Sequence, residues 1–247
     1  MPQQKIYSNE SVILLHGLAR SKRSFSKLES ILKKRGYHVV NQGYRSTKHT
    51  IEALSESVIP ASLKLCRGNQ KVHFVTHSLG GLILRNYMKN HTINNLGRIV
   101  MLGPPNNGCE IVDKLGSLCL FKFINGPAGL QLGTGPLDLP KSLGPVNYEV
   151  GVIAGTRSLN LFSYFILPGQ DDGKVTVEST KLKGMKDHII LPVTHTFMMN
   201  NKSVISQIEN FLANGYFVKK NQQPIEFPSI KYSQNFKSLH PEKITHW

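Results

Sequence analysis

Two patterns of hydrophobic and polar positions alternate along the chain. Strand-like apolar runs, of the kind buried in a parallel sheet, occur at residues 12–15, 37–41, 71–76, 98–102, 148–154 and 189–191. Between them, apolar residues recur at the spacing of one helix face, in segments 25–32, 51–66, 79–89 and 204–212. Alternating strands and helices are typical of a doubly wound sheet with right-handed crossovers. The sequence therefore predicts an α/β fold with a mainly parallel sheet.

A long insertion at residues 106–145 interrupts this alternation between the fourth and fifth predicted strands. In its first half, Ile111, Val112, Leu115 and Leu118 fall on one face of a predicted helix. Its second half is rich in glycine and proline. We predict a small cap whose apolar face lines a substrate pocket. The alternative is an ordinary crossover helix followed by a long loop.

Residues 215–247 form a second, irregular segment that contains three prolines. Its aromatic residues include Phe227, Tyr232, Phe236 and Trp247. Such side chains favour packing on the body of the protein over a free tail. The predicted organisation is an α/β domain of residues 1–214, with the cap at 106–145 inside it, followed by a basic and aromatic C-terminal extension of residues 215–247.

The most informative motif is the turn between the third predicted strand and the helix after it. Residues 75–82 read Val-Thr-His-Ser-Leu-Gly-Gly-Leu, so Ser78 lies at the tip of a strand-turn-helix unit. Gly80 and Gly81 leave room where strand and helix meet, and the turn lifts the serine hydroxyl clear of the sheet. This arrangement predicts that Ser78 is a nucleophile. A purely structural turn is the alternative.

A serine nucleophile needs a base, and the base needs an acid that orients it. Functional groups of a doubly wound sheet gather at the carboxyl ends of its strands. Of the five aspartates, Asp113 and Asp138 lie in the predicted cap and Asp187 precedes the last strand, at its wrong end. Asp171 and Asp172 remain, and we choose Asp172, beside the glycine, as the acid. An ordinary Asp-Gly turn is the alternative.

The base follows from the same reasoning. His188 precedes the last predicted strand, whereas the histidines beyond residue 215 lie in the irregular segment. His195 directly follows the last strand and is the predicted general base, with a capping or packing role as the alternative. The resulting order, Ser78, Asp172 and His195, is the order of a catalytic triad in this class of fold.

The first predicted strand ends in His16, Gly17 and Leu18. Gly17 permits a backbone turn that directs the Leu18 amide toward the pocket. The Leu79 amide, which follows Ser78, is the second predicted donor. Two N–H groups aimed at one point bind the oxyanion that develops when a nucleophile attacks a carbonyl group. We expect His16 to brace this loop through hydrogen bonds.

These motifs resemble those of α/β-hydrolases, and within them compact bacterial lipases and esterases, over residues 10–213. The matching pieces are Leu-His-Gly-Leu at 15–18, His-Ser-Leu-Gly-Gly at 77–81, Gly-Pro-Pro-Asn-Asn-Gly at 103–108, Asp-Asp-Gly-Lys-Val at 171–175, and His195. The resemblance supports Asp172 as the triad acid and Leu18 as an oxyanion donor. Thr76 departs from the Gly-x-Ser-x-Gly pattern but is also small.

The resemblance implies hydrolysis of a carboxylic ester, in a small molecule or a lipid, through an acyl-enzyme and without a metal or organic cofactor. A thioesterase or an acyltransferase would use the same triad. The alternative from another class is a non-catalytic protein of this fold that binds a ligand or another protein.

Composition adds a strong positive charge. Lys and Arg number 30 against 15 Asp and Glu, which gives a formal net charge of +15. The basic residues are scattered and no nucleic-acid-binding motif accompanies them, so we expect no specific nucleic-acid partner. Weak contact with an anionic surface is left open, as is the oligomeric state.

Cysteine usage and the apolar runs bear on the compartment. Cys66, Cys109 and Cys119 have neither a disulfide nor a metal-binding spacing, which favours free thiols in a reducing environment. No apolar run approaches the ~18 residues of a membrane-spanning helix, and the N-terminus lacks a signal-peptide pattern. We therefore expect a cytoplasmic protein, with secretion from a longer precursor left open.

Overall fold

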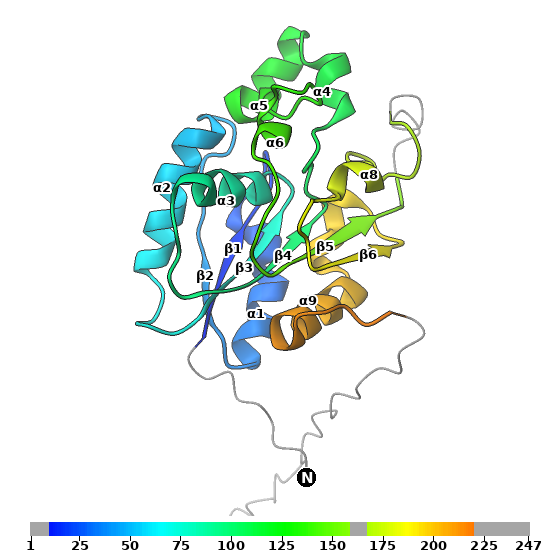
Figure 1. Ribbon diagram of the computed structural model, residues 1–247. Coiled ribbons are helices and arrows are strands. Elements are labelled where there is room, and N and C mark those ends of the chain that lie inside the picture. The colour runs from blue at the N-terminus through cyan, green and yellow to red at the C-terminus, as the bar shows by residue number, and fades with distance from the viewer. Residues whose placement is uncertain (1–9, 159–166, 220–247) are drawn as a thin grey trace, which may run out of the picture.

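A six-stranded parallel sheet runs through the centre of the molecule (Figure 1). The computed structural model describes residues 10–158 and 167–219. The strands lie in the order β2-β1-β3-β4-β5-β6, and each neighbouring pair is parallel. Their bounds are Ser11–Leu15 (β1), His38–Asn41 (β2), Val72–His77 (β3), Leu96–Leu102 (β4), Val150–Gly155 (β5) and Asp187–Leu191 (β6). The predicted α/β fold with a parallel sheet is confirmed.

Helices cover both faces of the sheet, α2 and α3 on one side and α1 and α9 on the other (Figure 1). The α-helices are Ser26–Lys34 (α1), Ile51–Lys64 (α2), Leu79–Asn90 (α3), Glu110–Leu115 (α4), Cys119–Leu130 (α5), Leu139–Ser142 (α6), Val177–Thr180 (α8) and Lys202–Asn214 (α9). Two 3-10 helices span Lys22–Phe25 and His195–Asn200.

The apolar runs of the central strands form two cores, one on each face of the sheet. Successive side chains of a strand point to opposite faces. In β3, Phe74 therefore packs with the α2 and α3 side, and Val75 packs with the α1 and α9 side. Every residue of β1, β3 and β5 is buried. Each large apolar side chain buried in this way contributes about 1.5–3 kcal/mol, so the two cores fix the register that positions the strand ends.

The strand order places a crevice at the carboxyl ends of β1 and β3. From β1 the chain crosses to β2 on one side of it, and then returns to β3 on the other side. Connections that diverge in this way leave a gap above the strand ends, which is where ligands bind in open α/β sheets. The loop of residues 16–18 follows β1 and Ser78 follows β3, so the two predicted parts of the site meet there.

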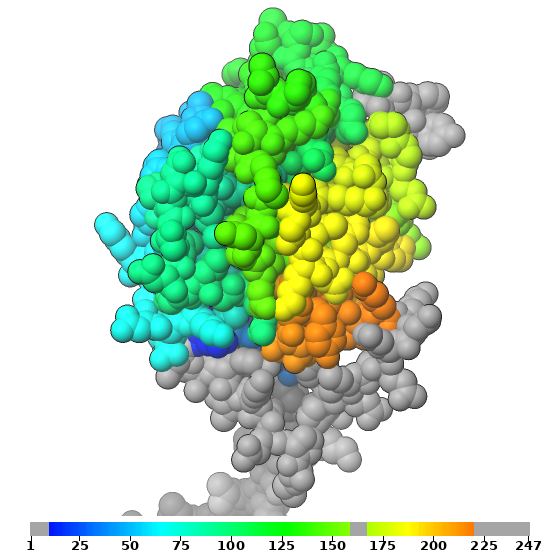
Figure 2. All heavy atoms as spheres, viewed as in Figure 1, coloured from blue at the N-terminus to red at the C-terminus, as the bar shows by residue number. Residues whose placement is uncertain are grey.

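The insertion at residues 106–145 forms a cap at this end of the molecule, drawn in green in Figures 1 and 2. The single helix predicted through Ile111 and Leu118 is wrong. Helix α4 ends at Leu115, a turn follows, and α5 begins at Cys119. Gly116 and Ser117 are poor helix formers at the break, which accounts for the interruption.

Contacts made by α5 and by Gln131, which follows it, hold the cap on the body of the protein. The main-chain N–H of Ile51, at the start of α2, donates to Gln131 Oε1 at 2.7 Å. Helix α5 kinks at Gly126, where φ is +63°. A Cβ atom at this position would lie within 1.8 Å of the Thr47 carbonyl oxygen, so only glycine lets the cap rest on the loop after β2.

The packed body continues beyond the predicted domain boundary at residue 214. Gly215 ends α9 with φ of +80°, a left-handed conformation in which the chain changes direction. Phe217 is 1% exposed and its ring centroid lies 4.8 Å from that of Phe211. Its main-chain N–H donates to Asp187 Oδ2 at 2.8 Å. The extension predicted to start at 215 therefore begins inside the core, while its aromatic residues from 227 onward lie outside the described residues.

Membrane-spanning helices and metal-binding clusters are both absent from the described residues. Among residues 10–158 and 167–219, no helix combines the length and apolar character needed to cross a membrane. The same residues contain no group of three or more His, Cys, Asp or Glu side chains arranged to hold a metal ion.

Candidate active site

Ser78 occupies a strained turn at the end of β3. Its φ of +51° and ψ of −120° are unusual for a residue with a side chain. Such a conformation costs on the order of 1–3 kcal/mol and is found where the surrounding structure enforces it. Its side chain lies in a crowded setting, with the residue only 9% exposed.

The two glycines after the serine differ in how tightly they are packed. A Cβ atom on Gly80 would come within 2.5 Å of the Leu15 carbonyl oxygen, so the start of α3 could not approach β1. On Gly81 the nearest atom would be Thr76 Oγ1 at 3.3 Å, a closer approach than most Cβ atoms make. The close crossing of strand and helix therefore depends chiefly on Gly80.

Asp172 and His195 form a buried pair. Asp172 Oδ2 lies 2.7 Å from His195 Nδ1, and the aspartate side chain is 0% exposed. Asp172 Oδ1 accepts hydrogen bonds from the main-chain N–H groups of Lys174 at 3.1 Å and Val175 at 2.9 Å. Both carboxylate oxygens are thus engaged, and the imidazole is held in one orientation.

Asp171 has a different environment. It is half-buried, and its Oδ1 accepts a hydrogen bond from the main-chain N–H of Gly173 at 2.7 Å. Its carboxylate is not the partner of the His195 ring. The structure therefore brings Asp172, and not Asp171, to the predicted base.

Gly103 makes room for this pair. It follows β4 with φ of +50°, and its main-chain N–H donates to the Ile153 carbonyl at 2.9 Å. A Cβ atom there would lie 2.9 Å from Asp172 Oδ2 and 3.1 Å from His195 Nδ1. Sequence reasoning assigned this glycine no separate role, although its place directly after a buried strand was the available signal.

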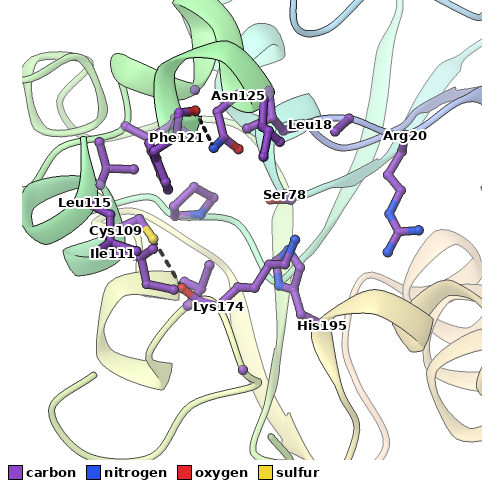
Figure 3. A pocket seen from close by; sticks show the side chains of 18 of the residues that line it. Leu18, Arg20, Ser78, Cys109, Ile111, Leu115, Phe121, Asn125, Lys174 and His195 are labelled. Carbon is purple, nitrogen blue, oxygen red and sulfur yellow. Dashed lines mark hydrogen bonds between the residues drawn. The ribbon is translucent and has the colours of Figure 1, made fainter. Parts of the chain in front are cut away.

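His195 begins a 3-10 helix just after β6. Its main-chain N–H donates to the Asp172 carbonyl at 2.9 Å, so the acid and the base are joined through both backbone and side chain. Because Nδ1 faces the carboxylate, Nε2 is the ring nitrogen left to accept a proton from a group in the pocket. Ser78 and His195 both line the same pocket (Figure 3).

His77 is a functional candidate that sequence reasoning missed. Its ring Nε2 lies 3.0 Å from the His195 carbonyl oxygen, and the two rings lie 4.7 Å apart. A carbonyl oxygen only accepts, so Nε2 carries the proton. Burial, with a smaller contribution from His195, places the pKa of His77 well below its ordinary value and keeps the ring neutral. Its position next to Ser78 was the signal in the sequence.

The loop after β1 meets the nucleophile turn. A Cβ atom on Gly17 would lie 2.8 Å from His77 Nδ1 and 3.2 Å from Ser78 Cβ, so this glycine is in contact with the turn. Leu18 lines the pocket, and Leu79 is the first residue of α3. The first N–H groups of a helix have no partner within it. The backbone of both predicted oxyanion donors thus borders the serine.

His16 braces this loop, as expected. Its Nδ1 lies 2.9 Å from the Gly17 carbonyl oxygen, and its Nε2 accepts from the main-chain N–H of Tyr44 at 3.3 Å. The Tyr44 ring stacks on the imidazole at 3.9 Å, and its hydroxyl donates to the His16 carbonyl. Burial lowers the pKa of His16, which favours the neutral ring.

A pocket of about 330 Å³ extends from Ser78 and His195 to the underside of the cap (Figure 3). Ile111 and Leu115 of α4 line it, as do Phe121 and Ile124 of α5. Leu118, predicted to share this role, does not line the pocket and is 54% exposed. The turn after α4 directs it away, and Phe121 takes its place.

Cys109 is a second candidate nucleophile among the described residues that line the pocket. Its thiol donates to the Lys174 carbonyl oxygen at 3.2 Å. Burial raises the pKa of the thiol to about 11, so it stays protonated at neutral pH. A protonated thiol is a poor nucleophile, which leaves Ser78 as the candidate.

Residues 11–134, half of the chain, match the sequence profile of palmitoyl protein thioesterases. The chain belongs to this family. The matched segment runs from β1 through the nucleophile turn and most of the cap. The family match and the fold together identify a hydrolase of ester substrates with the α/β-hydrolase fold. No curated protein matches the chain.

Solved structures with the same fold include bacterial and fungal lipases. The mature Bacillus licheniformis lipase BlEst2 is 16% identical, with a TM-score of 0.64 over 86% of this chain and 94% of that one. Phospholipase PlaB from Legionella pneumophila is 22% identical, with a TM-score of 0.58 over 70% of this chain and 46% of that one. Aspergillus fumigatus lipase B is 15% identical, with a TM-score of 0.62 over 85% and 54%.

Proposed function

We propose that this protein is a serine hydrolase that cleaves acyl esters or thioesters through an acyl-enzyme. The observation that carries the proposal is the buried Asp172–His195 pair, which opens onto the pocket that contains Ser78. The strained backbone of Ser78 supports it, because such conformations gather at functional sites.

In the proposed reaction, Ser78 Oγ attacks the acyl carbonyl carbon, and its proton passes to His195 Nε2. Asp172 stabilises the imidazolium that forms. The main-chain N–H groups of Leu18 and Leu79 bind the negative oxygen, an effect that is worth about 3–4 kcal/mol per donor in enzymes where it has been measured. The intermediate then expels the alcohol or thiol, which takes the proton from His195.

The second half of the reaction uses the same groups. A water molecule gives a proton to His195 as it attacks the acyl-enzyme, and the new intermediate releases the carboxylic acid and free Ser78. The imidazole again returns the proton, so the enzyme ends in its starting state.

The acyl chain fits the apolar half of the pocket. Ile111 and Leu115 of α4 and Phe121 of α5 line this half. Leu132, later in the same insertion, also lines it and packs against the core of the body. Residues 106–145 thus act in this proposal as a cap that provides acyl specificity, within a single α/β domain.

A thioesterase is the second candidate, and family membership is the observation that favours it. The same triad serves both reactions, because a thiol leaves from the intermediate as an alcohol does. The name of the family further suggests a long, saturated acyl chain as the group to be removed.

The test is labelling with a fluorophosphonate probe and hydrolysis of matched substrates. We expect the wild-type protein to be labelled and Ser78→Ala to lose both labelling and turnover, with an unchanged circular dichroism spectrum. An oxyester and a thioester with the same acyl chain separate the two candidates by their kcat/KM values. Absence of labelling and turnover in the folded wild-type protein contradicts the proposal and favours a binding protein of this fold.

A further inference from the structure

The pocket has an apolar half under the cap and a cationic half beside the nucleophile. Arg20, from the loop after β1, and Lys174, from the loop that contains Asp172, line the cationic half. In Figure 3, Ser78 lies between Arg20 and the Lys174 backbone, and the Lys174 side chain extends toward His195. Within the described part of the chain, no aspartate or glutamate side chain lines this pocket.

Neither cation has an ion-pair partner in the part of the chain that the structure describes. Among residues 10–158 and 167–219, Arg20 and Lys174 take part in no salt bridge. Asp172 is close in sequence, but its two oxygens are bonded to His195 and to two main-chain N–H groups. The two positive charges therefore face the pocket together.

The electrostatic effect of both cations reaches the reacting end of the pocket. The pKa of Lys174 is lowered, chiefly by burial and then by the charge of Arg20, although Asp172 opposes the shift. Both cations also contribute to the lowered pKa of His77, after burial and His195. Two like charges that line the same pocket as Ser78 create a site of positive potential.

We propose that Arg20 and Lys174 select substrates whose leaving group carries an anion, a phosphate or a carboxylate, a few bonds from the scissile ester. The inference rests on the proposed function. With the acyl chain in the apolar half, the leaving group occupies the cationic half. An anion there attracts both cations and so offsets the repulsion between them, whereas a neutral group does not.

The side chains of Arg20 and Lys174 are of the types that bind phosphate and carboxylate groups. Guanidinium N–H groups match the oxygens of phosphate and carboxylate in pairs, and an ammonium group adds a mobile point charge. Arg20 and Lys174 both retain solvent exposure although they line the pocket, so a substrate can contact both charged groups. This position favours a role in selecting the substrate over a role in stabilising the fold.

The experiment compares two matched pairs of substrates that differ only in the anion. For oxyesters, the pair is 1-acyl lysophosphatidate and 1-monoacylglycerol. For thioesters, the pair is an S-acyl 3-mercaptopropionate and the corresponding S-acyl 3-mercaptopropanol. Short acyl chains, used below their micelle-forming concentrations, exclude effects of a lipid surface. The readout is the ratio of kcat/KM for the anionic substrate to kcat/KM for its neutral partner.

We expect a wild-type ratio above unity for the phosphate pair, the carboxylate pair, or both, which identifies the source of the anion. Arg20→Gln and Lys174→Gln should each lower that ratio about three- to fivefold, as expected for exposed charge pairs. Added salt should lower the wild-type ratio. Arg23→Gln and Lys122→Gln remove the same charges from residues that do not line the pocket, and should leave the ratio unchanged.

Two results overturn the proposal while leaving the proposed function intact. One is efficient hydrolysis with wild-type ratios at or below unity in both pairs. The other is a ratio that Arg20→Gln and Lys174→Gln lower no more than the control variants do. If neither member of either pair is hydrolysed and the fluorophosphonate probe fails, the proposed function itself is wrong.

Discussion

At the scale of single residues, two adjacent aspartates have separate environments. Asp172 contacts His195 Nδ1 at 2.7 Å, whereas Asp171 is bonded to the turn at Gly173. We predict that Asp172→Asn lowers kcat by up to ~10⁴-fold, because the amide no longer orients and stabilises the imidazolium. Asp171→Asn is the matched control and should have a much smaller effect. Equal losses, measured with one ester under saturating conditions, contradict the assignment.

His77 is proposed as a positioning residue. Its Nε2 donates to the His195 carbonyl, and the loss of such a buried hydrogen bond costs about 1–3 kcal/mol. We predict that His77→Phe lowers kcat about tenfold with little change in KM, since the base loses its position rather than the substrate its binding. His77→Gln keeps an amide donor and should recover part of the rate. Equal kcat values for the wild-type protein and His77→Phe exclude this role.

At the scale of elements, α4 and the turn after it offer a matched test of the cap. Leu115 lines the pocket and Leu118 does not. We predict that Leu115→Ala shifts the preference toward longer acyl chains, because each methylene buried in the enlarged space adds about 0.8 kcal/mol. A partial collapse of the pocket would make the shift smaller. Leu118→Ala should leave the chain-length profile unchanged.

The measurement is kcat/KM for p-nitrophenyl esters of increasing acyl length. Identical profiles for Leu115→Ala and Leu118→Ala, together with a lower melting temperature for Leu115→Ala alone, would show that Leu115 only packs. The cap would then have no part in acyl selection.

The helices and strands also show which structural features could be predicted from the sequence and which could not. Continuous apolar runs such as residues 12–15 were enough to predict the strands, the glycine-flanked turn indicated Ser78, and the strand-end rule then selected Asp172 and His195. The break at Gly116 was missed, because the apolar spacing that continues across it was given more weight than the low helix propensity of Gly116 and Ser117. The burial of Phe217 was equally hidden, since its partner Phe211 belongs to an earlier helix.

At the scale of the whole molecule, several buried or half-buried histidines couple stability to pH. Burial lowers the pKa values of His16, His73, His77 and His188. In the unfolded chain these rings take up protons at an ordinary pKa of about 6.5, while the folded protein resists protonation. Stability is therefore complete above about pH 6.5 and falls on acidification, by up to about 1.4 kcal/mol per pH unit for each ring that stays neutral.

We predict that the free energy of unfolding, measured with urea at several pH values between about 7 and 5, decreases as the pH falls. His77→Gln removes one of the titrating groups and should flatten the curve. Stability that is constant or rises over this range contradicts the prediction. The net charge of +15 acts in the same direction, because each added proton increases repulsion within the folded protein.

The position of β6 at the edge of the sheet has a consequence for biosynthesis. This strand pairs with β5, and it leads directly to His195, more than a hundred residues after Ser78. A ribosome therefore completes the nucleophile turn long before it makes the proposed base. Until β6 docks on β5, Ser78 of the nascent polypeptide lacks its proposed base, His195. On the proposed assignment, the growing chain cannot hydrolyse esters in the cell before the last strand of its sheet is in place.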